Sequence, residues 1–324
     1  MKKFASLLSL AAVAALSLAA IPARAQTYPD RPVRIVLPFA AGGVADITAR
    51  VVAEALGTEL KQRFIVENTP GAGGIAAARA ALSAAHDGYT LAMLTNGTAI
   101  SVPLFKALPF DPVNDFLPIS SLGYFDFVVG TNPQSGIKTL GDAIRMAKEK
   151  PGALNVGTIN VGSTQNLSAE LLKTTAGVNF TIIPYRGSPE VIIGLLRNDV
   201  QLMIDSYPAM KSNIQEKKII PLATTNNVRS VVLPDVPTVE QSGVKGYEVL
   251  SWNALFAPKG TPQEVVTTIN KALQKILVDK DIKAKLLDLG IEAKASTPQE
   301  IATRLTDDIK KWGAVIERAN IPKQ

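Results

Sequence analysis

Residues 28–50 read YPDRPVRIVLPFAAGGVADITAR and contain the junction on which the fold interpretation depends. The apolar run at 33–37 is typical of a buried strand, and residues 45–60 have the apolar spacing of a helix. A proline ends the strand, and Gly42 and Gly43 precede the helix. A strand that passes through a glycine turn into a helix is half of a βα unit, so this segment predicts an α/β protein.

The same alternation continues along the chain. Further strands are predicted at 64–67, 90–94, 125–130, 155–158, 181–184, 201–204, 219–224 and 252–257. Helices are predicted to end near residue 85 and to cover 101–105, 140–148, 167–175, 189–196, 263–278 and 299–319. The proline-rich stretch 108–118 has neither periodicity and predicts an ordered loop. This pattern predicts mostly parallel sheets flanked by helices.

The length of the chain predicts two lobes. Without a leader the chain is near the size at which a single core stops growing and chains divide into domains. The simplest topology has a first lobe at 26–124, completed by 251–324, and a second lobe at 125–250. Such a chain crosses between the lobes twice.

Residues 1–25 have the features of a signal peptide. Lys2 and Lys3 precede a run of apolar and small residues, and Ala23-Arg24-Ala25 matches a small-x-small cleavage site. Export with cleavage near Ala25 is therefore expected, and an uncleaved membrane anchor stays open as an alternative. No cysteine follows the apolar run, so a lipid anchor has no attachment point.

Composition excludes several classes of function. The net charge is +6, and the leader contributes three basic residues and no acidic residue, so the mature chain carries +3. That charge is too small to favour nucleic-acid binding. The absence of cysteine excludes disulfides, thiolate metal sites and a cysteine nucleophile, and the single histidine offers no transition-metal cluster. A cation site of carboxylates alone, made by Asp46, Asp126 and Asp205, stays open.

Six loops at the predicted carboxyl ends of strands form the candidate site. In an open α/β sheet, ligands bind beyond the carboxyl ends of the strands. Helix N-termini in such loops present free N–H groups and favour an anion. One terminus contributes about 0.3–1 kcal/mol, whereas micromolar binding needs about 8 kcal/mol. Two lobes that close on one ligand therefore explain the pattern better than any single loop. The six loops are 39–43, 70–74, 95–98, 162–166, 186–188 and 205–208.

Two enzymatic readings fit the sequence poorly. Residues 71–76 contain G-x-G-x-x-A, but the acid expected at the end of the next strand is missing, since Asp87 precedes that strand. A secreted α/β hydrolase would need His86 to leave its His-Asp-Gly turn, and no G-x-S-x-G occurs. The hydrolase stays open as a distant alternative.

Three charged side chains in these loops have both a structural and a functional interpretation. Asp46 lies in the first turn of its helix, where an acid stabilises the terminus, or else it accepts from ligand or ordered water. Asp205 either forms a turn or pairs with a ligand amine. Arg186 either makes a salt bridge at the mouth between the lobes or binds a carboxylate through two nitrogens.

Six stretches together resemble one known family. They are YPDRPVR (28–34), PFAAGG (38–43) with Asp46, ENTPGAGG (67–74), DGYTL (87–91), PYRG (184–187) and LPDVPT (233–238). In this order, over the whole mature chain, they resemble the Bug family of periplasmic solute-binding proteins of tripartite tricarboxylate transporters. The resemblance implies a two-lobed fold of the periplasmic-binding type with two crossings, no catalysis, no cofactor or metal, and a small carboxylate ligand.

The resemblance also implies where a ligand binds. The carboxylate would be held mainly by backbone groups and waters of the first two glycine loops, and the second lobe would supply contacts that vary with the ligand. The predicted ligand-binding residues are Phe39, Ala41, Gly42, Gly43, Asp46, Ala72, Gly73, Gly74, Thr95, Asn96, Gly97, Thr98, Ser163, Thr164, Asn166, Tyr185, Arg186, Gly187 and Asp205. Many relatives have proline where this chain has Ala41 and histidine where it has Asn166, so the ligand of a relative cannot be transferred.

The expected function is capture of a small mono- or dicarboxylate in the periplasm for a membrane permease. Presentation of the ligand to a sensor kinase is the alternative within the same class. A monomer is expected, with no nucleic acid among its partners.

Overall fold

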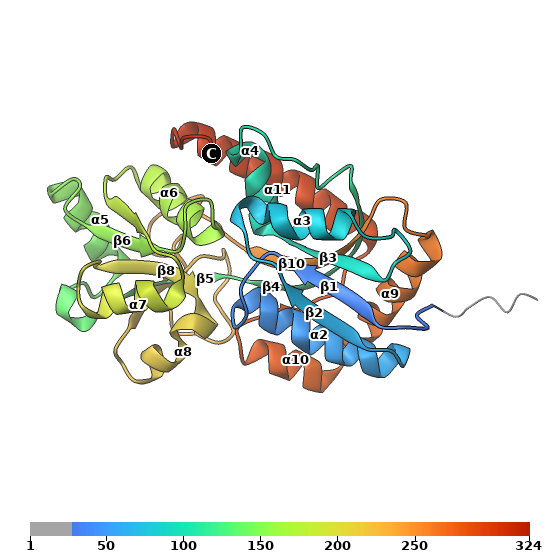
Figure 1. Cartoon of the computed structure of the whole chain (residues 1–324). Coiled ribbons are helices and arrows are strands. Elements are labelled where there is room, and N and C mark those ends of the chain that lie inside the picture. The colour runs from blue at the N-terminus through green and yellow to red at the C-terminus, as the bar shows by residue number, and fades with distance from the viewer. Residues whose placement is uncertain (1–27) are drawn as a thin grey trace, which may run out of the picture. The chain divides into compact units, whose positions relative to one another are not determined.

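The computed structural model describes residues 28–324, and the predicted leader at 1–25 lies outside the described residues. Residues 31–324 form one compact unit that contains two β-sheets (Figure 1). The strands of the first sheet come from residues 33–125 and 251–293, and those of the second come from residues 127–224. The predicted α/β architecture is confirmed, whereas the exact lobe boundaries stay predictions.

The first sheet has the strand order β11-β4-β10-β3-β1-β2. β1 runs parallel to β2 and β3, whereas β10 runs antiparallel to β3 and β4. The carboxyl ends of β1, β2 and β3 therefore meet at one edge of the sheet, where ligands bind in such folds. The strands are β1 (Val33–Leu37), β2 (Phe64–Asn68), β3 (Thr90–Thr95), β4 (Phe116–Phe125), β10 (Ser251–Pro258) and β11 (Glu292–Ala293).

The second sheet has the order β7-β6-β8-β5-β9. β6 runs parallel to β7 and β8, and β5 runs antiparallel to its neighbours β8 and β9. Both sheets thus place an antiparallel strand, β10 or β5, beside three parallel ones, and the first sheet also carries β11 antiparallel to β4. The strands are β5 (Phe127–Thr131), β6 (Asn155–Thr158), β7 (Thr181–Pro184), β8 (Leu202–Ser206) and β9 (Ile220–Thr224).

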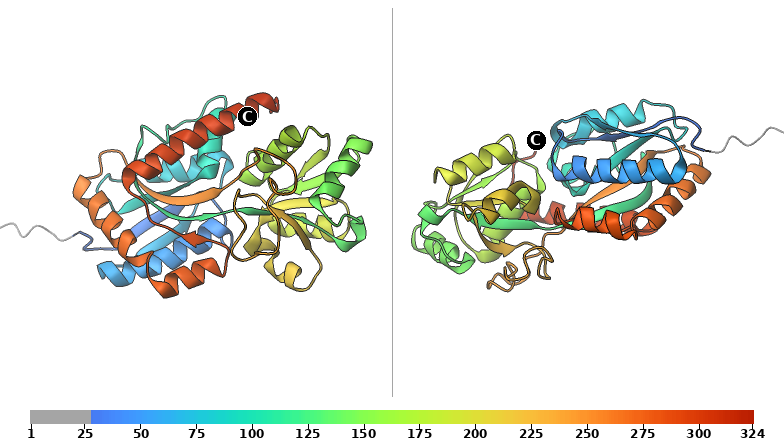
Figure 2. Two further views of the ribbon diagram at one scale, coloured as in Figure 1. Left: turned by 180° about the vertical axis from the view of Figure 1, so that it is seen from behind. Right: turned by 90° about the horizontal axis from the view of Figure 1, so that it is seen from below.

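Helices cover both sheets, and short 3-10 turns lie at Ala72–Gly74 and Pro133–Ser135. The long C-terminal helix α11, red in Figure 2, packs against α4 and β4 and also touches α6 beside the second sheet. The helices are α2 (Val44–Leu60), α3 (Ile75–Leu82), α4 (Asn96–Leu104), α5 (Leu140–Glu149), α6 (Thr164–Ala176), α7 (Ser188–Leu196), α8 (Tyr207–Gln215), α9 (Gln263–Ile276), α10 (Lys280–Leu287) and α11 (Pro298–Arg318). No helix among residues 28–324 is long and apolar enough to span a bilayer.

The apolar core runs through both sheets. One cluster joins Leu104 of α4 and Trp312 of α11 to Phe127 and Ile204 of the second sheet. A separate cluster around Met203 covers the opposite face of the second sheet under α7 and α8. Burial of a large aliphatic or aromatic side chain stabilises a fold by about 1.5–3 kcal/mol, so the shared cluster is the main support for the contact between the two sheets.

The two segments that connect the sheets are held by one threonine. β4 ends at Phe125 and β5 begins at Phe127, while the chain returns through Val249 into β10. The Thr225 hydroxyl accepts from the Phe127 backbone N–H at 2.8 Å and donates to the Val249 carbonyl at 2.9 Å. Both crossings therefore lie side by side at this point, in agreement with the two predicted crossings.

Some predicted elements differ from those observed. β4 begins at Phe116, inside the stretch predicted to be a loop. The sequence reading missed α8, because a Tyr-Pro pair resembles a turn, and missed α10, in which Leu286 alone is buried. It also placed the start of two helices too late, since α4 begins at Asn96 and α6 at Thr164. Residues predicted to form binding loops there lie instead in first helical turns.

Candidate functional site

The first glycine loop is exposed and open. Residues 39–43 all lie at the surface between β1 and α2. Gly42 has φ +88°, a left-handed conformation that favours glycine. Gly43 is the N-cap of α2 with φ −84°, and a Cβ added to either glycine would meet no atom within 4 Å. The backbone of this loop is therefore open to a ligand.

Asp46 holds this loop in place together with two residues that the sequence reading did not select. Its carboxylate accepts from the Gly42 N–H at 2.9 Å, from the Arg50 Nε at 3.0 Å and from the Asn68 Nδ2 at 2.9 Å. Asn68 also donates to the Phe39 carbonyl at 3.0 Å, and its oxygen accepts from Arg50 at 3.0 Å. The structure thus supports the structural interpretation of Asp46, whose oxygens are occupied by protein donors.

The charge of Asp46 is compensated locally. Burial opposes ionisation of this carboxyl, but the hydrogen bonds from Arg50, Gly42 and Asn68 outweigh burial and hold its pKa below the usual value. The Arg50 guanidinium lies 2.9 Å from the carboxylate. Since the acid is ionised and paired, it does not leave a net negative charge beside the N-terminus of α2.

The second glycine loop touches the first. Gly73 and Gly74 both have positive φ, at 63° and 70°, and Gly74 is the N-cap of α3 without a side-chain cap. A Cβ on Gly74 would lie 3.4 Å from the Pro38 side chain, and one on Gly73 would lie 2.9 Å from the Phe105 ring. Ala72, which begins a short 3-10 turn, is exposed. A larger residue would be strained at both glycines by the positive φ, and at Gly73 it would also collide with the Phe105 ring.

The first turn of α4 reaches toward the second sheet. Asn96 is fully buried; its oxygen accepts from the Trp312 indole at 2.9 Å and its nitrogen donates to the Thr164 hydroxyl at 3.2 Å. A Cβ on Gly97 would lie 3.8 Å from the Phe39 ring, so the first loop and α4 are also neighbours. Thr95 and Thr98 are buried at the same place, where the Thr95 N–H donates to the Thr98 hydroxyl at 3.2 Å.

The N-terminus of α6 faces Asn96 from the second sheet. Ser163 caps this helix by accepting from the Asn166 N–H at 3.1 Å. The Asn166 side chain is buried and bonded inside the protein, to the Thr158 hydroxyl at 3.2 Å and to the Gly162 N–H at 3.4 Å. Asn166 therefore shapes the loop at 162–163, and its neighbour Gln165 is the side chain that remains partly exposed there.

Asp205 lies at the end of β8 and is 1% exposed. One carboxylate oxygen accepts from the Gln165 side chain at 3.1 Å and from the Ser206 N–H at 2.7 Å. The other oxygen has no hydrogen bond of good geometry among the described residues. Burial raises the pKa of this carboxyl, and the nearby Ser188, Gln165 and Ser206 oppose that rise.

The three ligand-binding residues predicted at the start of α7 lie in different environments. Tyr185 packs inward against Gly157 and Gly194 and belongs to the core under α7. Gly187 is the N-cap of α7, with extended backbone and no side-chain cap. Arg186 is exposed and its side chain makes no ion pair within the part of the chain that the structure describes. The predicted structural salt bridge of Arg186 is therefore not seen.

Four helices of the candidate site begin without a side-chain cap, a feature that they share with α9 outside the site. The N-caps of α2, α3, α7 and α8 provide no side-chain hydrogen bond. By contrast, side chains of Thr139, Asp279 and Thr297 cap α5, α10 and α11, which do not follow the carboxyl ends of parallel strands. Among the site helices, α6 is capped by Ser163, and α4 begins with a capping box of Thr95 and Thr98. The first N–H groups of a helix have no partner inside it, so the uncapped termini leave donors for a ligand.

The arrangement does not favour the alternative chemistries. His86 is exposed, bonds to the Leu82 carbonyl at 3.1 Å, and precedes β3, whereas the site lies beyond the other end of that strand. Asp87 pairs with Arg31 at 2.7 Å, so it does not serve a dinucleotide ribose. Within residues 28–324, no cluster of three or more His, Cys, Asp or Glu side chains is arranged to hold a metal ion.

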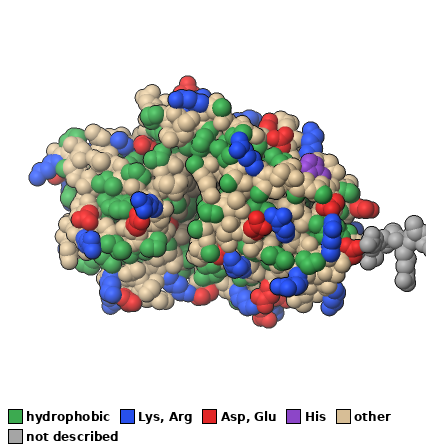
Figure 3. All heavy atoms as spheres, viewed as in Figure 1, with side chains coloured by type: hydrophobic (Ala, Val, Ile, Leu, Met, Phe, Trp, Pro, Cys, Tyr) green, Lys and Arg blue, Asp and Glu red, His purple; other side chains and the backbone are tan. Residues whose placement is uncertain are grey.

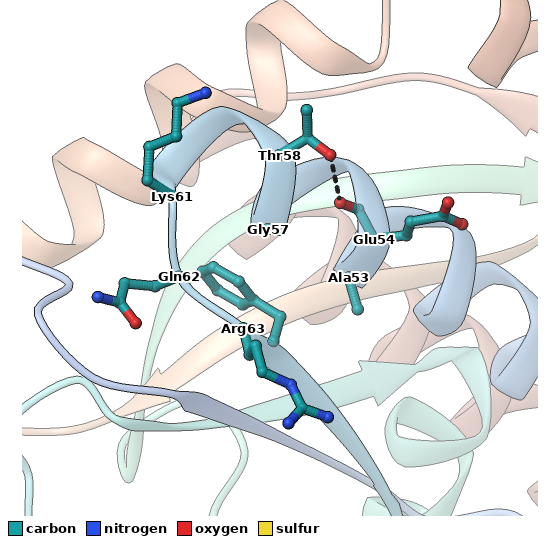
Figure 4. A pocket seen from close by; sticks show the side chains of 8 residues that line it. Ala53, Glu54, Gly57, Thr58, Lys61, Gln62 and Arg63 are labelled. Carbon is teal, nitrogen blue, oxygen red and sulfur yellow. Dashed lines mark hydrogen bonds between the residues drawn. The ribbon is translucent and has the colours of Figure 1, made fainter.

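A cavity of about 500 Å³ lies at the far end of α2 (Figure 4). Glu54, Thr58, Lys61 and Arg63 are among its lining residues, and the Thr58 hydroxyl donates to the Glu54 carbonyl at 3.2 Å. Because α2 has 17 residues, this end is about 25 Å from its N-terminus. The cavity is therefore separate from the glycine loops.

Charged side chains do not concentrate on the face shown in Figure 3. Lys and Arg alternate with Asp and Glu across it, which agrees with the small net charge. This face therefore offers no broad basic surface to attract an anion.

Comparison with known proteins gives consistent matches. The family described as "Tripartite tricarboxylate transporter family receptor" matches residues 48–321. Protein BugT of Bordetella pertussis is 31% identical over 299 residues, which cover 92% of this chain and 92% of BugT. The solved structure of R. palustris Rpa4515 with adipate aligns with a TM-score of 0.85 at 33% identity, covering 91% of this chain and 99% of that chain.

A second ligand-bound structure is similar over the same length. MatC from Rhodopseudomonas palustris with bound malate aligns with a TM-score of 0.80 at 31% identity, covering 89% of this chain and all of the other. Agreement over nearly the whole length of both solved structures confirms the predicted two-lobed α/β fold.

Proposed function

Because the chain belongs to the tripartite tricarboxylate transporter receptor family, whose members include the periplasmic Bug solute-binding proteins, we propose that it captures a small organic acid for a membrane permease. Its sequence motifs predicted this membership, which is confirmed. Two similar structures, named above, contain adipate and malate, and both ligands are small dicarboxylates. The proposal extends carboxylate binding to this chain.

The observation that carries the proposal is the set of uncapped helix N-termini. The open loop at 39–43 leads into α2, and Gly74, Gly187 and Ser206 precede three further helices without side-chain caps. Each terminus favours an anion by about 0.3–1 kcal/mol, and up to about 2 kcal/mol when partly buried. Several such termini, with direct hydrogen bonds to the carboxylate, reach the roughly 8 kcal/mol of micromolar binding.

The proposed site contains residues expected from the sequence, and these residues have different roles. The loop 39–43 and residues 72–74 would hold the carboxylate, while Asp46 with Arg50 and Asn68 would position the first loop. Thr164, Arg186 and Gly187 would contribute from the second lobe, and Asn96 would join the two sides through Thr164. The lobes themselves would comprise residues 26–124 with 251–324, and residues 125–250.

The proposal further assigns the chain a non-catalytic, monomeric role in the periplasm. The family is one of receptors, and its members are periplasmic binding proteins. Export by the leader at 1–25 is proposed from the sequence alone. The position of His86 away from the site supports a receptor without hydrolytic chemistry. Presentation of the ligand to a sensor kinase, in place of transport, would use the same site.

Thermal melting tests the proposal. The protein, exported with its own leader and purified from a periplasm, would be melted with carboxylates of two to eight carbons, amino acids, sugars and simple cations. A ligand at about 100 times its Kd adds about 2.7 kcal/mol of stability, and each kcal/mol raises Tm by about 2–4 °C. A shift with acids alone is expected. If sugars or cations shifted Tm and acids did not, the proposal would be wrong.

A further inference from the structure

The amide of Gln165 has a fixed orientation. Its nitrogen donates to the Asp205 carboxylate at 3.1 Å. The Asp205 oxygen that it contacts also accepts from the Ser206 N–H, so this oxygen acts as an acceptor and the NH₂ group of the amide faces it. The amide oxygen of Gln165 consequently points the other way. It has no hydrogen-bond partner among the described residues, and it is not one of the buried unpartnered atoms.

Asp205 is itself held firmly. The same oxygen that accepts from Gln165 accepts from the Ser206 N–H at 2.7 Å, and the side chain is 1% exposed. The acid is therefore an internal support beneath Gln165 and not a surface that a ligand reaches. In the first turn of α6, Gln165 stands above it as the partly exposed polar side chain.

Gln165 also lies where the two sheets meet at the site. Its neighbour Thr164 accepts from Asn96 of α4 at 3.2 Å. A Cβ on Gly162, at the start of the same loop, would collide with the Leu104 side chain of α4. The N-terminus of α6 is thus in contact with the half of the protein that carries the open glycine loops.

We propose that Gln165 determines ligand specificity by presenting its amide oxygen to a hydrogen-bond donor on the ligand, with Asp205 as the positioning residue. The inference rests on the proposed function, because it assumes an acid held by the glycine loops. A ligand of matching chemistry has a carboxylate at one end and a hydroxyl or ammonium group at the other. A second ionised carboxylate would meet the amide oxygen and be disfavoured.

Titration calorimetry at neutral pH with matched acids tests this inference. The exported protein would be titrated with succinate and 4-hydroxybutyrate, and with adipate and 6-hydroxyhexanoate. Each pair has one chain length and differs only in the terminal carboxylate or hydroxyl. We expect the hydroxy acid to bind about tenfold more tightly in at least one pair, which is the effect of one hydrogen bond.

Two variants test the role of Gln165 separately from that of Asp205. Gln165→Met keeps the length of the side chain and removes the acceptor, so it should abolish the preference by weakening hydroxy-acid binding, while dicarboxylate affinity does not fall. Asp205→Asn should keep the preference, because its remaining oxygen still accepts from Gln165. Gln215→Met, an exposed change at the far end of α8, is the matched control and should alter nothing.

The outcomes are distinguishable. If Asp205→Asn abolishes the preference, then the charge of Asp205 sets selectivity and the inference is wrong. If acids bind and Gln165→Met leaves the preference unchanged, the inference is also wrong while the proposed function stands. If none of the acids binds any form of the protein, the proposed function fails and the inference fails with it.

Discussion

The Trp312 indole nitrogen donates to the Asn96 side-chain oxygen at 2.9 Å, although the two residues are 216 positions apart. Both side chains are buried, and the Asn96 nitrogen in turn donates to Thr164. The C-terminal helix thus fixes the amide orientation of Asn96, and Asn96 fixes the start of α6. This chain of contacts connects three segments that are distant in sequence at the place where the ligand is proposed to bind.

The first prediction concerns this contact. Trp312→Phe leaves the Asn96 oxygen buried without a donor, so the free energy of unfolding should fall by about 1–3 kcal/mol. Because the amide of Asn96 is then free to turn, acid affinity should fall as well. Urea unfolding and titration calorimetry measure the two effects.

Trp252→Phe provides the matched control. The Trp252 indole donates to Asp308 at 2.6 Å on the side of α11 that carries Arg304, so this buried tryptophan also loses an indole hydrogen bond on substitution, but its acceptor is not Asn96. This variant should lose stability and keep its affinity. Equal loss of affinity in both tryptophan variants would contradict a specific role for Asn96.

Parts of the site were predictable because they depend on neighbours in sequence. Gly42, Gly43, Gly73 and Gly74 follow strands and precede helices, and local patterns reveal such junctions. The partners of Asp46 were not predictable in the same way, since Asn68 lies 22 positions from it and meets it only in the folded sheet. Whether a side chain is buried likewise depends on residues that are distant from it in sequence.

The roles of individual side chains were harder to predict than their positions. Asn166 and Tyr185 lie in the expected segments but face the protein interior. No local signal marks Gln165 between Thr164 and Asn166, because its orientation depends on Asp205, which is 40 residues away. Helix α8 is hidden locally by its Tyr-Pro start, which resembles a turn, and its Met210 becomes buried only through distant residues of α7 and the second sheet.

A second prediction tests the first glycine loop. Gly43→Val should fold normally, because φ at this position is −84° and an added Cβ meets nothing within 4 Å. The branched side chain should nevertheless occupy the space over the N-terminus of α2 and lower acid affinity by at least about tenfold, the effect of losing one good hydrogen bond. Calorimetry gives the affinity and thermal melting confirms the fold.

Gly141→Val is the control for this change. Gly141 lies in the first turn of α5, where an added Cβ has only the Thr139 hydroxyl at 3.6 Å. It should leave affinity unchanged. Gly74→Val is a poorer test, since φ +70° makes any larger residue strained there. Full affinity in Gly43→Val would remove this loop from the binding site.

A third prediction concerns the pH dependence of Asp46. Its pKa is lowered in the folded protein, so the ionised form stabilises the fold above the unfolded pKa, and that stability is lost as pH falls through the folded pKa. The difference in unfolding free energy between wild type and Asp46→Asn should therefore be largest above about pH 5 and shrink below about pH 4. Urea midpoints across this range measure it, and a difference that grows toward acid pH would contradict the assignment.

A fourth prediction concerns Asp126, which lies between β4 and β5 at the first crossing. Burial raises the pKa of this carboxyl to about 6, and one of its oxygens has no hydrogen-bond partner among the described residues. A raised folded pKa means that the folded state binds the proton more tightly, so stability should fall as pH rises from about 4 to about 6. Two units of pKa correspond to roughly 3 kcal/mol.

Asp126→Asn removes this titration. The variant should be more stable than wild type at neutral pH, and the two should converge below about pH 4, where the acid becomes protonated in the unfolded state as well as in the folded state. Asp115→Asn changes a half-buried acid before β4 whose carboxylate accepts from the Asp111 N–H at 2.7 Å, and this comparison variant should show no such gain. Wild-type stability that stays constant between about pH 4 and 7 would show that Asp126 is not destabilised by burial.

The fifth prediction tests whether Arg186 contacts the ligand. Its guanidinium is exposed at the start of α7 and makes no ion pair among residues 28–324, so it is available for a carboxylate. Arg186→Gln should weaken acid binding by about fivefold to fiftyfold if it donates to the ligand, since charged hydrogen bonds contribute about 1.5–3 kcal/mol, and it should reduce the dependence of affinity on salt. Arg197→Gln, at the other end of α7, removes an equally exposed arginine and should leave both quantities unchanged. If the two variants behaved alike, Arg186 would act only through the general charge of the second lobe, and the backbone donors of the first lobe would have to account for binding the acid.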